Sequence, residues 1–180
     1  MARNSVDDFI SNQKKAFKKL PKRVRDEINK SQDARLASLV FATNRCESPI
    51  EQLLMIYLYD LETELRTELG DMELRTHVKS SAQENVVVNG KRYRLDFFIE
   101  CTVGDTNHKF AIECDGHDFH EKTKEQAARD KSKDRNLASE GYTVIRFTGA
   151  EIWDRPVRCI SEISDIIYTK TGLKDYWDSV

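Results

Sequence analysis

Acidic residues interrupt two short apolar runs in the middle of the chain, FAIECDG at residues 110–116 and LDFFI at residues 95–99. Alternation in a β-strand would place Glu113 and Asp115 on one face, and Ile112 and Cys114 on the other. Asp96 lies inside the other run. A carboxylate buried in a sheet costs several kcal/mol unless a partner or a metal stabilises it, so all three require an explanation.

The segments around these residues predict helices and strands in alternation. Asn89-Gly90 is a strong hairpin signal, and Ser48-Pro49-Ile50-Glu51 combines a capping serine, an early proline and a glutamate that can close a capping box. The sequence therefore predicts an α/β domain with a central mixed β-sheet flanked by helices. Strands are expected at 74–79, 86–88, 92–100, 109–114 and 142–147, and helices at 48–70 and 121–140, with a further helix at the C-terminus.

The first 45 residues differ from the rest in charge. They contain 11 Lys and Arg against 5 Asp and Glu, whereas the whole chain has a net charge of −2. Apolar positions recur at helical spacing, so we expect a basic helical extension over 1–45 and one globular domain over 46–180. From charge alone a solvated helix face is the favoured explanation, but the lysines also suit a polyanion such as the DNA backbone. The candidate nucleic-acid-binding residues are Lys14, Lys15, Lys18 and Lys19.

Composition narrows the class of protein. With 180 residues, 39% hydrophobic and 33% charged, the chain suits one globular domain with a charged surface. It has no apolar run of about 18–20 residues and no signal-peptide pattern, so we expect a cytoplasmic protein without a membrane partner. Its four cysteines form no Cys-x-x-Cys pair and are expected to be reduced packing residues.

The three carboxylates are expected to meet at one edge of the sheet. Hard oxygen ligands in such a cluster suit Mg²⁺ or Mn²⁺, which can activate water and neutralise charge on a phosphodiester. We therefore assign Asp96, Glu113 and Asp115 as candidate metal ligands. For Glu113 or Asp115 alone, a solvent-facing position on a half-exposed strand is an equally good explanation.

Taken together, these segments resemble the PD-(D/E)xK nuclease superfamily, and within it the branch of very-short-patch-repair-type endonucleases. The resemblance covers about residues 48–155 and implies a restriction-endonuclease-like core that cleaves DNA with a metal. It is carried by the segments YRLDF at 93–97, IECDGHDFH at 112–120, ARD at 128–130 and GYTVIRF at 141–147.

The resemblance also implies roles for individual residues. Asp96 matches the first metal-binding aspartate and Glu113 the acidic residue of the second motif. Glu51 resembles a helical glutamate placed beside the metal, although its position in a capping box explains it equally well. Asp130 and Lys133, on the predicted helix, match positions that orient the site.

One departure from the superfamily pattern concerns the residue two positions after Glu113, where a lysine is usual and this chain has Asp115. A carboxylate cannot act as an ammonium group toward the scissile phosphate. The candidate replacements are His117, His120, Lys122 and Lys124, of which we favour His120 as the acid/base and Lys124 as a phosphate contact.

Several alternatives remain open. Cys114, His117 and His120 have zinc-like spacing, although strand alternation turns Cys114 away from Glu113. Arg146 is a candidate ion-pair partner for the acidic residues. A module that has lost catalysis but still binds nucleic acid or protein would keep the same fold, and the sequence leaves both a monomer and a homodimer open.

Overall fold

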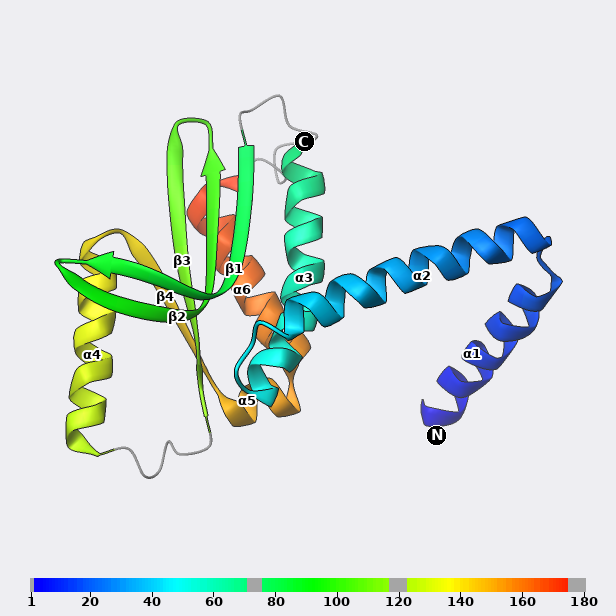
Figure 1. Cartoon of the computed structure of the whole chain (residues 1–180), viewed down its shortest axis with the longest axis horizontal. Helices are drawn as coiled ribbons and strands as arrows, with labels where there is room; N and C mark the ends of the chain where they lie inside the picture. The colour runs from blue at the N-terminus through cyan, green and yellow to red at the C-terminus, as the bar shows by residue number, and fades with distance from the viewer. Residues whose placement is uncertain (1, 71–75, 117–122, 175–180) are drawn as a thin grey trace. The chain divides into compact units, whose positions relative to one another are not determined.

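The computed structural model describes residues 2–70, 76–116 and 123–174, which form an α/β structure (Figure 1). The chain divides into two compact units, Met1–Val40 and Phe41–Val180. The predicted boundary between the helical extension and the domain lies a few residues later, between 45 and 46, and this division stays a prediction. The elements are α1 (Ala2–Lys19), α2 (Lys22–Thr43), α3 (Pro49–Gly70), β1 (Thr76–Val88), β2 (Lys91–Val103), β3 (Thr106–Asp115), α4 (Lys124–Ser139), β4 (Tyr142–Thr148), α5 (Gly149–Asp154) and α6 (Pro156–Thr171).

The first unit is helical, as predicted. α1 and α2 are separated by Leu20 and Pro21, and Arg25 Nη1 donates a hydrogen bond to the Lys18 carbonyl oxygen at 2.8 Å. None of the side chains described in α2 is buried. The four candidate DNA-binding lysines are all exposed on α1.

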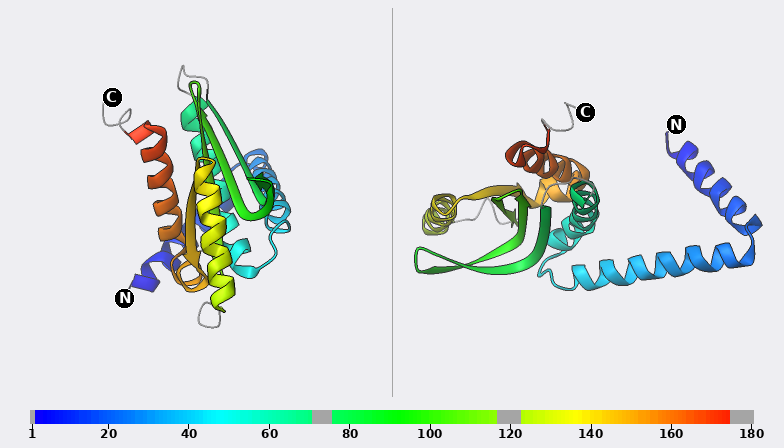
Figure 2. Two further views of the ribbon diagram at one scale, coloured as in Figure 1. Left: turned by 90° about the vertical axis from the view of Figure 1, so that its left-hand side faces the viewer. Right: turned by 90° about the horizontal axis from the view of Figure 1, so that it is seen from above.

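The second unit contains a four-stranded mixed sheet in the order β1-β2-β3-β4. β1 pairs antiparallel with β2, β2 antiparallel with β3, and β3 parallel with β4. Figure 2 shows α4 on one face of the sheet and α3, α5 and α6 on the other. The predicted α/β class and the predicted mixed sheet are therefore confirmed.

The strand prediction was wrong for β1. The predicted strands at 74–79 and 86–88 are parts of one strand, in so far as they lie in the described residues, because pairing with β2 extends from Thr76 to Val88. The polar segment between them hid this continuity. The helix predicted at 121–140 starts at Lys124 in the described residues, where Thr123 forms a capping box with Gln126.

The hairpin of β1 and β2 changes face halfway along its length. In β1, Ala82 packs into one hydrophobic cluster and Val88 into another, although both are even-numbered. In β2, Phe97 packs into the cluster of Ala82 and Leu95 into the cluster of Val88, although both are odd-numbered. Strict alternation would keep each pair on one face, so both strands reverse between these positions. The hairpin curves so that its turn reaches α4 (Figure 1), where Asn89 Nδ2 donates to Ser139 Oγ at 3.1 Å.

The two faces of the sheet bury separate clusters. The larger cluster joins α3, α5 and α6 to all four strands and includes the fully buried Leu54, Phe110 and Ile163. The smaller one packs the hairpin arm against Leu137 of α4. Asp96 lies where β2 passes from one cluster to the other, so an acidic residue occupies a place that neither apolar core fills.

The four cysteines are free thiols, and Cys46, Cys101 and Cys159 are buried, as expected for packing residues. In the described parts of the chain, no helix has the length and apolar character needed to cross a membrane.

Candidate active site

Asp96 of β2 and Glu113 of β3 are the acidic pair of the site. Phe97 pairs with Ile112, so antiparallel register sets Asp96 opposite Glu113. The Cys114 N–H donates to Asp96 Oδ2 at 2.7 Å, which ties the Asp96 side chain to β3. The predicted meeting of these two carboxylates at one place in the sheet therefore agrees with the fold.

Glu113 is only 6% exposed, and its two carboxylate oxygens differ in their contacts. Lys133 of α4 donates to Glu113 Oε2 at 2.6 Å and to the Arg94 carbonyl oxygen at 2.7 Å. Glu113 Oε1 is buried and accepts no hydrogen bond in the described part of the chain. Burying such an acceptor is costly, so this oxygen is suited to a ligand.

The pKa values of both carboxyls are raised. For Asp96 the largest cause is burial, which the hydrogen bond from Cys114 opposes. For Glu113 burial again raises the pKa, while the charge and hydrogen bond of Lys133 lower it and the charge of Asp96 raises it. Two buried carboxyls with raised pKa values, one of them raised further by the charge of the other, are an arrangement that a divalent cation would relieve.

Arg146 of β4 binds the acidic residues next to this pair. Its guanidinium lies 3.2 Å from Asp115 Oδ1, 2.7 Å from Asp134 Oδ1 and 4.0 Å from Glu113 Oε2. The expectation of an ion pair between Arg146 and the acidic residues is therefore confirmed. Asp115 lies on the same face as Glu113 but is engaged by Arg146, and its role as a metal ligand stays a prediction.

Glu51 caps α3 and also borders the site. It is 7% exposed, and Ser48 Oγ donates to its Oε1 at 2.7 Å while the Glu47 N–H donates to Oε2 at 2.9 Å. Gln83 Nε2 donates to Oε2 at 2.7 Å from β1. The charge of Glu51 raises the pKa of Asp96, behind burial, so this helix cap is also an electrostatic neighbour of the acidic pair.

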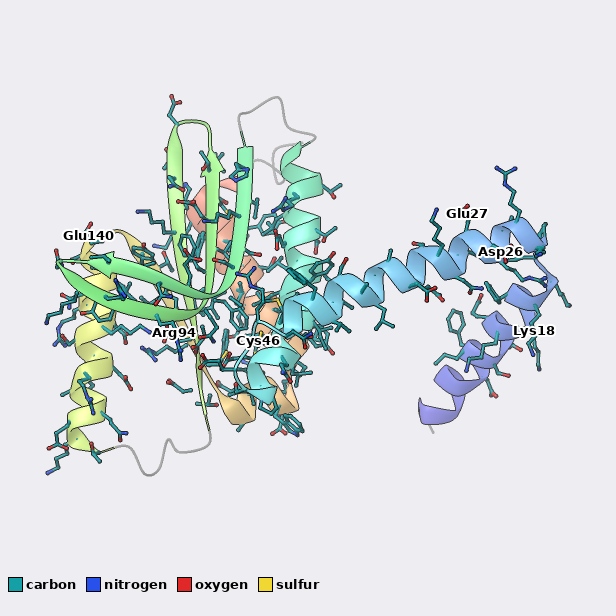
Figure 3. The ribbon with its side chains drawn as sticks, viewed as in Figure 1. Lys18, Asp26, Glu27, Cys46, Arg94 and Glu140 are labelled. Carbon is teal, nitrogen blue, oxygen red and sulfur yellow. The ribbon has the colours of Figure 1, made fainter. Side chains whose placement is uncertain are left out.

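Arg94 joins the start of α3 to β2. Its guanidinium binds Glu47 through two hydrogen bonds of 2.7 and 2.6 Å, and both side chains are about half exposed. Figure 3 labels Arg94, which extends from the curved part of the hairpin. Because Lys133 binds the Arg94 main chain, this residue connects the segment just before α3 to α4 across β2.

The candidate replacements for the usual lysine are placed differently. His117, His120 and Lys122 lie outside the described residues. Lys124 is exposed at the start of α4, nine residues before Lys133, which corresponds to about 13 Å along the helix. No hydrogen bond or ion pair among the described residues joins Lys124 to the acidic pair, and its role as a phosphate contact stays a prediction.

Lys133 has a larger part in the site than the sequence predicts, because the resemblance assigns it only an orienting role. A signal was available: Lys133 is four residues before Leu137, the one residue of α4 that is buried. Residues four apart share a helix face, so a helix that buries Leu137 against the sheet also brings Lys133 to it.

The structure argues against a zinc site at Cys114, the one candidate zinc ligand that lies in the described residues. Cys114 packs against the larger core on the face away from Glu113, and burial raises the pKa of its thiol. A metal would need the thiolate, which that environment disfavours.

The acidic pair has the chemistry for a hard cation. In the described residues, no three His, Cys, Asp or Glu side chains are grouped so as to hold a metal ion. Asp96 and Glu113 nevertheless present carboxylate oxygens, and the unpaired Glu113 Oε1 gives such an ion a ligand without breaking a contact. Mg²⁺ and Mn²⁺ complete their shells with water and neutral oxygens, so two carboxylates can be enough from the protein.

The comparisons with known proteins agree with this geometry. The model of a restriction-endonuclease-like family, REase_MTES_1575, matches residues 73–167, which is more than half of the chain. The matched part includes Asp96, Glu113, Lys133 and Arg146, whereas Glu51 and the N-terminal helices lie before it. No curated protein and no solved structure matches this chain.

Proposed function

The chain belongs to the restriction-endonuclease-like family, and we propose that it is a metal-dependent DNA endonuclease that hydrolyses phosphodiester bonds. One observation carries the proposal: Glu113, opposite Asp96, binds an ammonium group through one oxygen and keeps the other buried and unpaired. A nuclease of this kind needs both a place for a cation and a positive group beside it.

Asp96 and Glu113 would hold the metal. When bound, a Mg²⁺ or Mn²⁺ ion supplies Lewis acidity toward the phosphate and lowers the pKa of a bound water. The Cys114 N–H keeps Asp96 fixed, because it holds Oδ2 and leaves Oδ1 for a ligand. Such fixed side chains avoid the cost of reorganisation during the reaction.

Lys133 would do the work of the lysine that Asp115 replaces. Its ammonium group has three protons, and the two described acceptors, Glu113 Oε2 and the Arg94 carbonyl oxygen, use two of them. The third can donate to the attacking water or to the scissile phosphate. With its side chain 16% exposed, Lys133 is near enough to the surface to meet a substrate.

We assign His117 and His120 to proton transfer, with His120 as the acid/base, because imidazole titrates near neutral pH. The likeness of their segment to the very-short-patch-repair-type branch supports this part of the proposal.

The exposed lysines of α1 are assigned to the DNA backbone. Lys14, Lys15, Lys18 and Lys19 lie on a unit with an excess of positive charge, whereas the rest of the chain is acidic and attracts a duplex weakly. The sites of chemistry and of general DNA affinity would then lie in different units of the chain.

A cleavage assay tests the proposal. Plasmid, linear duplex and single-stranded DNA are incubated with the full chain in millimolar Mg²⁺ or Mn²⁺ or in EDTA, beside Asp96→Ala and the control Asp105→Ala. Metal-dependent cleavage by the unmodified protein and by Asp105→Ala, but not by Asp96→Ala, is expected. Binding of DNA without cleavage under every metal condition would favour the catalytically inactive module instead.

A further inference from the structure

Gln83 of β1 combines three unusual features in the described part of the chain. Its φ is +55°, in the left-handed region that a non-glycine residue rarely adopts. It stands opposite Asp96, at the one position where the ladder between β1 and β2 is interrupted, since Ala82 pairs with Phe97 and Glu84 with Leu95. Its side-chain oxygen is buried and accepts no hydrogen bond there.

Glu51 fixes the direction of the Gln83 amide. A carboxylate can only accept hydrogen bonds, and Gln83 lies 2.7 Å from Glu51 Oε2, so the end of the amide at Glu51 must be the NH₂ group. The oxygen Oε1 is therefore the end turned away from Glu51. Charge decides this orientation, because the flipped amide would set oxygen against oxygen.

The surroundings of Gln83 are rich in acceptors. Glu51 is buried beside it, and the charge of Glu51 reaches Asp96, which faces Gln83 across the two strands. Glu113, opposite Asp96 on the next strand, has an unpaired carboxylate oxygen of its own. The unpaired Gln83 Oε1 is an acceptor like the oxygens of these carboxylates, so they cannot satisfy it, whereas a cation can bind acceptors of both kinds.

We propose that Gln83 Oε1 is a neutral oxygen ligand of the metal held by Asp96 and Glu113, and that Glu51 is the positioning residue that directs it there. This inference rests on the proposed function. It explains why a glutamine occupies a strained backbone position. The left-handed conformation interrupts the ladder, so the Gln83 side chain does not follow the alternation of the strand. It also gives Glu51 a role in addition to capping α3.

Mn²⁺ titration of the full chain by calorimetry tests the ligand. Gln83→Gly removes the amide and suits the positive φ, so the fold should be kept or stabilised, and Mn²⁺ affinity should fall roughly 10- to 100-fold. Gln83→Asn keeps an amide but is one methylene too short to reach both Glu51 and the metal, so it should lose affinity to a similar extent. Asn89→Gly is the matched control, since Asn89 also has a positive φ, +50°, but lies at the hairpin turn.

The outcomes separate this inference from the proposed function. Unchanged Mn²⁺ affinity in Gln83→Gly, together with loss of binding in Asp96→Asn, would overturn the role of Gln83 and leave the metal site standing. No Mn²⁺ binding by the unmodified protein would overturn both.

A double-mutant cycle tests Glu51. If Glu51 acts through Gln83, Glu51→Gln weakens Mn²⁺ binding in the unmodified protein but has little further effect in Gln83→Gly. Equal losses in both backgrounds would make Glu51 act on the metal independently and would overturn its positioning role.

Discussion

The ammonium group of Lys133 lies 2.6 Å from Glu113 Oε2, so α4 supplies the cation for a carboxylate on β3 that is twenty residues earlier in the chain. The superfamily pattern would place this lysine on β3 itself, two residues after Glu113. Here that position is Asp115, and its carboxylate is bound by Arg146 instead. The positive charge beside the acidic pair therefore comes from the helix packed on the strand.

Lys133→Met should abolish cleavage while keeping the length and apolar character of the side chain. The variant leaves Glu113 without its cation, so the apo protein should also lose about 3 kcal/mol of stability. Mn²⁺ binding should remain, because the lost charge repels a cation. The measurements are plasmid cleavage well below the melting temperature and calorimetric Mn²⁺ affinity.

The matched control is Lys131→Met, which removes one charge from the exposed side of the same helix. It should cleave and melt like the unmodified protein. Equal cleavage by Lys133→Met and Lys131→Met would remove Lys133 from the mechanism.

The raised pKa values of Asp96 and Glu113 make the apo fold sensitive to pH. Because the folded protein holds these protons more tightly than the unfolded chain, the groups favour folding at low pH, and this contribution is lost as the pH rises through the raised values. Asp96→Asn removes one of the two. In EDTA its melting temperature should exceed that of the unmodified protein by a few degrees at neutral pH, since ~1 kcal/mol corresponds to about 2–4 °C at this chain length.

The difference in melting temperature should shrink as the pH falls and nearly vanish below about pH 3, where Asp96 is protonated in both the folded and the unfolded state. Adding Mn²⁺ at neutral pH should reverse the order, because the ion stabilises only the protein that binds it. Asp105→Asn, in the exposed turn between β2 and β3, should show no such difference at any pH. A difference that grows as the pH falls would contradict the assignment.

The long helices and the strands β2, β3 and β4 were predictable because local signals mark them. Ser48 and Pro49 indicate the start of α3, and Asn89-Gly90 indicates the turn of the long hairpin. β1 was predicted as two strands since the segment around Gln83 has neither alternation nor apolar character. What holds it in the sheet is the pairing with β2 and the change of face at Asp96, which depend on residues distant in sequence.

The acidic pair was predictable because a carboxylate inside an otherwise apolar strand is unusual. Lys133 did not stand out, because lysine is ordinary on a charged helix and only the packing of Leu137 shows which face meets the sheet. Gln83 gave no signal in the sequence. Its significance comes from its backbone conformation and from its contact with Glu51, thirty-two residues away.

Changing Lys14, Lys15, Lys18 and Lys19 to Gln should weaken DNA binding without harming the fold, since all four side chains are exposed on α1. The salt dependence should weaken as well, by up to about one unit of log–log slope for each phosphate contact that is lost. Fluorescence anisotropy with labelled duplex over a range of salt concentrations measures both quantities.

A control with the same change of charge removes four exposed lysines of the second unit, Lys79, Lys131, Lys170 and Lys174. If the α1 surface is the DNA site, this control should lose less affinity and keep more of the salt slope. Equal effects of the two sets would mean that only net charge matters.

His120 is expected to transfer a proton, so its protonation state should control the rate. A histidine base works only when neutral, and cleavage by the unmodified protein should therefore fall as the pH drops below about 6.5. His120→Ala should lose most of its activity at every pH while binding Mn²⁺ as before, because Asp96 and Glu113 remain. His108→Ala on β3 is the control, and it should keep both the rate and the pH profile. Full activity in His120→Ala would assign the acid/base role to His117, Lys122 or Lys124 instead. Loss of Mn²⁺ binding in this variant would make His120 a metal ligand. The zinc site with the spacing Cys114-x-x-His117-x-x-His120 would then have to be considered again.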